Sequence, residues 1–267
     1  DVVDDDVADL VDDQVDLVLG GLEADGWMVN QARMWVASQW SVRHGLDWRA
    51  GELRMRRLLL DGSRDANALG WQWTAGTATG RPYGFSRQQV ERRAPGTCAG
   101  CMHRTACPIG QWPDSGEPMR TDPDPRLRRD PDPQATAGPD APEIRDFADA
   151  VWLTAEALGD CDPALAANPD IPAVFVFDEG YLRRLRPAAA RLIFIAEALA
   201  DLSARRPVEV HRGDPVAVLA GRRVAATFTP VPGWRARASA IRPSQVHPWP
   251  WLRRPAAGSV ASFSAWR

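Results

Sequence analysis

A proline-rich segment divides the chain into two parts with different sequence patterns, and this division constrains the fold more than any other feature. Residues 113–142 contain eight prolines among Asp, Arg and Gly, with almost no large apolar side chains to bury. Such a composition is typical of an extended linker. We therefore expect a domain at residues 1–112, a linker at 113–142, a second domain at 143–232 and a tail at 233–267.

The part before the linker predicts an all-helical domain. Its first apolar residues recur at helical spacing with aspartates between them, which predicts an amphipathic helix. Residues 27–43 and 50–60 also predict helices, the second capped by Asp47 and ended by Asp61-Gly62. The apolar positions of the first helix are Val3, Val7, Val11, Val15 and Val18.

The part after the linker predicts an α/β domain. Short apolar or β-branched runs predict four strands, and a helical pattern over residues 186–205 lies between the second and the third. This spacing favours a parallel sheet with crossover helices. The expected fold class is an all-helical domain followed by a small Rossmann-like parallel-sheet domain. The predicted strands are Ala150–Leu153, Ala173–Phe177, Val208–Val210 and Val224–Phe228.

Composition and charge exclude several classes of protein. An apolar content of 45% excludes disorder throughout, and the apolar stretches fall short of the roughly 20 residues that a bilayer requires. We expect a cytoplasmic protein without a membrane partner. No acid follows Asp214, so the tail, which contains Trp234, Trp249, Trp251 and Trp266, is basic. It could bind phosphates while its indoles stack on bases, or it could be solvated or docked on the acidic first helix.

Residues 26–73 combine features that a plain helical core does not require. Asn30 and Arg33 lie three residues apart on one predicted helix, next to Trp27, so an amide, a cation and an aromatic ring converge. Farther along, the run Gly70-Trp71-Gln72-Trp73 places glycine beside tryptophan, which allows a flat ligand to approach closely. A packed core with a structural ion pair between Arg33 and Asp61 is the alternative.

The order and spacing of these residues resemble the C-terminal half of the FAD-binding domain of the DNA photolyase and cryptochrome family. The resemblance rests on four motifs. They are Gly26-Trp27-Met28-Val29-Asn30-Gln31-Ala32-Arg33-Met34, Asp47-Trp48-Arg49, Asp61-Gly62 with Asn67, and Gly70-Trp71-Gln72-Trp73-Thr74-Ala75-Gly76-Thr77.

The resemblance implies a set of flavin-binding residues. Arg33 and Asp61 are similar to the family's ion pair beside the flavin, and Asn30 and Trp27 to residues that line the cavity. Asn67 is similar to the asparagine that faces flavin N5, where an amide can hydrogen-bond either protonation state. FAD is therefore the implied cofactor.

The resemblance also implies a reaction and a substrate. Met34 and Trp73 resemble the residues on which a thymine dimer rests, and Trp71 and Trp48 resemble the proximal and middle members of the tryptophan chain that photoreduces the flavin. The implied activity is that of a deoxyribodipyrimidine photo-lyase, in which light-excited reduced FAD donates an electron to cyclobutane pyrimidine dimers in DNA. The alternatives are a cryptochrome-like blue-light sensor without repair and a non-catalytic DNA-binding relic with an iron–sulfur cluster.

The sequence also departs from the family pattern. The half of the flavin domain that precedes the Trp-Met-x-Asn motif, with the Ser/Thr-rich segment that holds the pyrophosphate, is replaced by the acidic helix. Val29 stands where many photolyases carry histidine, and Ser63 replaces the second acid of an Asp-Gly-Asp pattern. We therefore expect a partner chain to supply the missing half of the FAD-binding domain.

Three cysteines close together in the sequence form a candidate metal site. Cys98, Cys101 and Cys107 have a spacing that resembles the last three ligands of the [4Fe-4S] loop of DNA glycosylases. The position of a fourth such ligand is Glu91. His103 could instead complete a zinc site with three cysteines. A chain without metal is the third interpretation.

The α/β part resembles, more weakly, the N-terminal antenna domain of the same family, in reversed order along the chain. The resemblance implies an antenna chromophore, with no residue identified to hold it. Asp178 and Asp214 fall at the ends of predicted strands, where ligands of α/β domains usually bind. Helix capping is the alternative interpretation for both.

Overall fold

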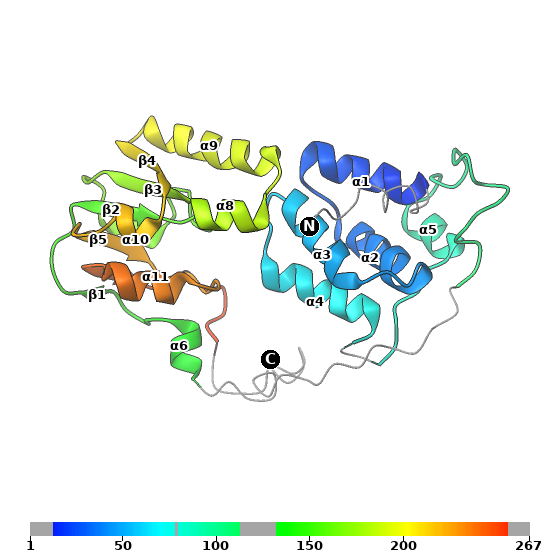
Figure 1. Ribbon diagram of the computed structural model, residues 1–267, viewed down its shortest axis with the longest axis horizontal. Helices are drawn as coiled ribbons and strands as arrows, with labels where there is room; N and C mark the ends of the chain where they lie inside the picture. The colour runs from blue at the N-terminus through cyan, green and yellow to red at the C-terminus, as the bar shows by residue number, and fades with distance from the viewer. Residues whose placement is uncertain (1–12, 78–79, 113–131, 256–267) are drawn as a thin grey trace. The chain divides into compact units, whose positions relative to one another are not determined.

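The computed structural model describes residues 13–77, 80–112 and 132–255 (Figure 1). The chain divides into two compact units, of which the first comprises residues 1–123 with 187–192 and the second residues 124–186 with 193–267. The start of the predicted first helix and residues 113–131 of the predicted linker lie outside the described residues.

The first unit is helical, as the sequence predicts. The helices predicted at residues 27–43 and 50–60 are confirmed, with shifted ends. Asp47 caps the second of them, because its carboxylate accepts the backbone N–H of Arg49 at 3.1 Å. The elements are α1 (Asp13–Asp25), α2 (Asn30–Ser38), the π-helical turn η2 (Gln39–Arg43), α3 (Trp48–Leu58), α4 (Arg64–Ala75) and α5 (Arg87–Arg93).

The core of this unit lies where α2, α3 and α4 meet. Trp40, Trp48 and Trp71 are buried there with aliphatic side chains of α1 and α3. Gly51 lets α3 approach α4, since a Cβ at that position would lie 2.3 Å from the Trp71 ring and 3.1 Å from the Trp40 ring. Gly76, with φ of 80°, ends α4 in the left-handed conformation that favours glycine.

The second unit is built on a six-stranded mixed sheet with strand order β1-β6-β5-β2-β3-β4. The four predicted strands are confirmed and pair in parallel, while β1 is antiparallel to β6 at the edge. The strands are β1 (Glu143–Ile144), β2 (Ala150–Leu153), β3 (Ala173–Asp178), β4 (Val208–Gly213), β5 (Val224–Thr227) and β6 (Gln245–His247).

Helices cover both faces of the sheet, and the strands alternate accordingly. Val151 and Leu153 of β2 pack in one apolar cluster with residues of α7 and α9, whereas Trp152 packs in another with residues of α10 and α11. A strand buried on both faces explains the continuous apolar run in the sequence. The helices are α6 (Pro133–Ala137), α7 (Pro163–Ala167), α8 (Glu179–Leu185), α9 (Ala189–Ser203), α10 (Pro215–Val218) and α11 (Trp234–Ile241).

Three features of this unit differ from the sequence prediction. The expected tail at residues 233–267 supplies α11 and β6, and β6 pairs with β5. The end of the expected linker forms α6, whose N-terminus is capped by Asp132, which accepts the Ala135 N–H at 2.9 Å. The sheet therefore has six strands rather than four. The tail folds because its tryptophans supply apolar surface, as Trp234 does against Trp152 and Phe228.

Within the described ranges, no helix combines the length and the apolar character needed to cross a bilayer.

Candidate functional site

The predicted ion pair between α2 and the turn before α4 is formed. An Nη atom of Arg33 lies 3.5 Å from the Asp61 carboxylate, and Arg33 Nε donates a hydrogen bond to the Met28 carbonyl oxygen at 2.9 Å. The Arg33 side chain is 25% exposed and that of Asp61 is 60% exposed. An ion pair this open to water adds little to stability, so its main effect is to fix the direction of the guanidinium.

Two residues that precede Arg33 are exposed. Trp27, just before α2, is 62% exposed, and Asn30, the first residue of α2, is also exposed. The Asn30 amide nitrogen lies 3.7 Å from the sulfur of Met34, one turn later. We call Trp27, Asn30, Arg33 and Asp61 the open face of the helical unit. It presents an indole, an amide and an oriented ion pair to whatever lies against it.

Trp73 near the end of α4 is the other exposed tryptophan that the sequence singles out. Its ring is 43% exposed and lies 5.3 Å from the ring of Tyr83, tilted by 38°. The π-face of an exposed ring can stack on a nucleobase.

Asn67 lies inside the unit rather than at the surface. Its amide nitrogen donates to the backbone carbonyl of Glu52 at 2.9 Å and to the Glu52 carboxylate at 3.0 Å. Glu52 is itself buried, and Arg56 Nε lies 3.9 Å from its carboxylate. The amide hydrogens of Asn67 are thus directed to α3. The sequence analysis missed Glu52, although it is an isolated acid on a helix rich in arginine.

Trp71 and Trp48 are both buried in the helical core. Trp71 is 2% exposed, and the indole N–H groups of both residues lack a hydrogen-bond partner within the described residues. The sequence analysis missed Trp40, whose ring centroid lies 6.4 Å from that of Trp71 at an interplanar angle of 83°. The Trp40 N–H donates to the Asp47 carbonyl oxygen at 2.9 Å. A buried N–H group without a partner lowers the stability of the fold by about 1–3 kcal/mol, so the indole N–H groups of Trp48 and Trp71 are both unfavourable for the fold on their own.

These residues fit one wall of a site for FAD. The open face offers an indole edge, an amide and a guanidinium held in one direction, which suit a planar ring with polar edges. The tryptophans in the core of the same unit are buried and therefore shielded from water. An opposite wall and contacts to a pyrophosphate would have to come from elsewhere.

The cysteines do not converge. Cys98 is buried beside Phe85 and Ile109, while Cys101 and Cys107 are partly exposed. Burial, followed by a hydrogen bond to Glu91, raises the pKa of the Cys98 thiol to about 11. Across the described ranges, no three His, Cys, Asp or Glu side chains are close enough to hold a metal ion. Iron–sulfur and zinc therefore remain predictions from spacing alone.

The two acids at strand ends serve as helix caps. Asp178 accepts the Tyr181 N–H at 2.9 Å, and Asp214 accepts the Val216 N–H at 3.0 Å. The capping interpretation is confirmed for both. No residue is thereby identified for an antenna chromophore, which remains a prediction.

Comparisons with known proteins concern the helical unit. Residues 13–92 match the family model described as the FAD binding domain of DNA photolyase. Similar curated proteins are the deoxyribodipyrimidine photo-lyases of Streptomyces griseus (45% identical over 65 residues), Vibrio cholerae (44% over 70) and Escherichia coli (43% over 65). These matches cover 24–26% of this chain and only 14–15% of the length of those relatives.

No solved structure matches the chain. The family match nevertheless spans the whole open face and the three buried tryptophans. Residues 13–92 are therefore similar to the FAD binding domain of DNA photolyase.

Proposed function

We propose that this chain is part of a photolyase-related flavoprotein that binds FAD and repairs cyclobutane pyrimidine dimers in DNA with light. The match of residues 13–92 supports the cofactor, and the names of the relatives support the reaction. The observation that carries the proposal is the Arg33–Asp61 ion pair on an exposed face that also holds Trp27 and Asn30.

The open face would hold one side of the flavin. Arg33, fixed by Asp61 and by the Met28 carbonyl, would orient the ring, while Trp27 and Asn30 would line its edge. Asn67 would direct its side-chain carbonyl oxygen to the flavin, because its amide nitrogen already donates hydrogen bonds to Glu52. Bound in reduced form, FAD supplies the light-excited electron donor that splitting a dimer requires.

The remaining assigned residues act beside this wall. Trp71 and Trp48 would supply electrons that keep the cofactor reduced, from positions that are buried and dry. Trp73 and Met34 would support the flipped dimer, for which an exposed aromatic face is suited.

A second polypeptide segment would complete the site. The aligned part amounts to 14–15% of the relatives' length, and the open face leaves a large indole in water. We propose that the segment in contact with this face supplies the pyrophosphate contacts of the family's flavin domain.

The proposal is tested by titrating the full chain with FAD and following flavin fluorescence anisotropy. Arg33→Ala should weaken binding roughly tenfold, which corresponds to the loss of one charge-assisted contact. Arg54→Ala is the matched control, because Arg54 is an arginine of the same unit that forms an ion pair, with Glu23 at 3.1 Å, and is not one of the residues of the open face. Equal affinities for the two variants, or no binding of FAD at any concentration, would contradict a flavin site here.

Repair is tested separately on the FAD-loaded, reduced chain. Illumination with an oligonucleotide that contains a thymine dimer should restore thymine without strand loss. FAD binding with no restored thymine would rule out the repair assignment and favour a light sensor.

A further inference from the structure

The basic segment after Asp214 is not explained by the proposed flavin site. In the described part of this segment, most arginines have partners: Arg222 with Glu209 at 2.7 Å, Arg223 over the Phe147 ring at 3.6 Å, Arg237 with Asp178 at 3.6 Å, and Arg254 with the Pro139 carbonyl at 2.8 Å. Arg235 and Arg242 differ, because no acidic partner accompanies either of them among the residues that the structure describes. The Arg235 guanidinium lies 5.8 Å from the centre of the Phe228 ring.

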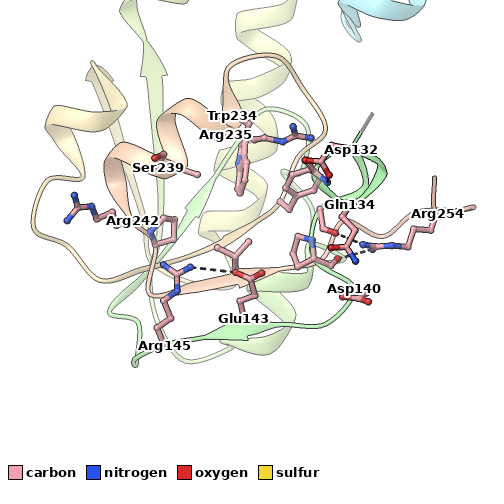
Figure 2. A pocket seen from close by; sticks show the side chains of 17 residues that line it. Asp132, Gln134, Asp140, Glu143, Arg145, Trp234, Arg235, Ser239, Arg242 and Arg254 are labelled. Atoms are coloured by element: carbon pink, nitrogen blue, oxygen red, sulfur yellow. Dashed lines mark hydrogen bonds and ion pairs between the residues drawn. The ribbon is translucent and has the colours of Figure 1, made fainter. Parts of the chain in front are cut away.

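Arg235 lines a surface hollow of about 730 Å³ that lies entirely within the α/β unit. Figure 2 shows Arg235 and Ser239 reaching it from α11 and Arg145 from the other side, just after β1. The carboxylates of Asp140 and Glu143 also line it. This volume is within the range of sites for small organic ligands.

The hollow is built by segments that are far apart in the sequence and are fixed to one another. The Trp251 indole N–H donates to the Ala137 carbonyl at 2.9 Å, which ties the end of α6 to the C-terminal segment. Gly138, with φ of 72°, passes so close to Phe228 that an added Cβ would lie 2.4 Å from its ring. Contacts of this kind hold the wall in place before any ligand arrives.

The charges around the hollow are incompletely paired. Arg145 has only a loose ion pair with Glu143, at 3.7 Å, and both side chains are largely exposed. Trp234, which also lines the hollow, has a buried indole N–H with no partner in the described ranges. The hollow thus has guanidinium groups on two sides, with the carboxylates of Asp140 and Glu143 also in its lining.

We propose that this hollow binds a phosphate ester of nucleotide size. Guanidinium groups bind phosphate oxygens in a planar, two-pronged geometry, which suits Arg235 and Arg145. The carboxylates of Asp140 and Glu143 would accept hydrogen bonds from the hydroxyl or amino groups at the other end of the ligand. The site is separate from the open face of the helical unit and from the flavin proposed there.

The test is isothermal titration of the full chain with AMP and with adenosine. AMP should bind saturably and at least about tenfold more tightly than adenosine, because only AMP carries the phosphate. Arg235→Ala should abolish this preference. Alanine favours helices, so this change should leave α11 folded, and Arg235→Gln provides a second variant of similar size. Arg183→Ala is the matched control, because Arg183 lies on α8, has a side chain that is 76% exposed and does not line the hollow.

Equal affinity for AMP and adenosine, no saturable binding of AMP, or unchanged AMP binding in both Arg235 variants would overturn the proposal. FAD contains an adenylate group, so the two sites must be distinguished. Arg33→Ala should leave AMP binding intact, which separates a failure of this proposal from a failure of the flavin proposal.

Discussion

The two units differ in how far they expose the tryptophans that the sequence singles out. In the α/β unit, Trp152 and Trp234 are each 4% exposed, and their rings stack 6.2 Å apart. In the helical unit, Trp27 is 62% exposed and Trp73 is 43% exposed, although Trp71, two residues before Trp73, is buried. The described tryptophans of the sheet's core are closed in by its own helices, whereas the helical unit has a buried tryptophan core and exposes Trp27 and Trp73 besides. We expect this exposed pair, and not the buried ones, to be available for contacts.

The strongest way to break this comparison is to remove one tryptophan from each unit. Trp152→Ala should cost about 3–5 kcal/mol, because it leaves a cavity in a closed core. Trp27→Ala should change stability by no more than about 0.5 kcal/mol, since its ring is already in water. Urea denaturation followed by circular dichroism measures both. A large loss for Trp27→Ala would mean that the open face is covered in solution.

A second comparison uses two glycines of the helical unit. Gly51→Ala should destabilise the chain by about 1–3 kcal/mol, because the new methyl would collide with the Trp71 ring. Gly70→Ala on α4, where nothing lies within 4 Å, should instead stabilise by about 0.5–1 kcal/mol through helix propensity. The same denaturation experiment tests both. Stabilisation by both changes would show that α3 and α4 are not closely packed.

The smallest expected effect is a pH dependence confined to the α/β unit. Burial lowers the pKa of His247 below 6.5, while the nearby Asp162 carboxylate opposes that shift. Between the folded-state pKa and 6.5 the unfolded chain binds the proton more readily, so stability should fall as the pH decreases through this window. His44 and His103 of the helical unit are not buried.

The measurement is urea denaturation at several values from about pH 7.5 to about pH 5. His247→Gln should flatten the slope. Burial raises the pKa of Asp162, and the charge of His247 lowers it, so the difference between the two proteins reports His247 together with its effect on Asp162. Identical slopes would show that His247 takes up its proton equally in the folded and unfolded states.

Local patterns predicted most of the elements. Asp47 marked the start of α3, and the uninterrupted apolar run Ala150–Leu153 marked a central strand. The missed elements depend on distant partners. β6 has three residues, too few to show a period, and α11 is held by Trp234 stacking on Trp152 from another part of the chain.

The candidate site could be predicted only in part. The sequence motif predicted the Arg33–Asp61 ion pair, which the structure contains. It could not predict that Asn67 turns to Glu52, because nothing in a helical period shows which polar residue lies at a helix interface. Cysteine spacing suggested a metal site, which stays a prediction; in the structure Cys98 lies in a small apolar cluster against which Cys107 also packs.

The most direct test of the open face is the indole N–H spectrum of the ¹⁵N-labelled chain, recorded as FAD is added in the presence of excess AMP. The account predicts that the Trp27 signal, assigned with Trp27→Phe, shifts with FAD while the Trp152 signal stays in place. If Trp27 does not move, or if Trp152 moves as far as Trp27 does, the open face is not a flavin-binding wall.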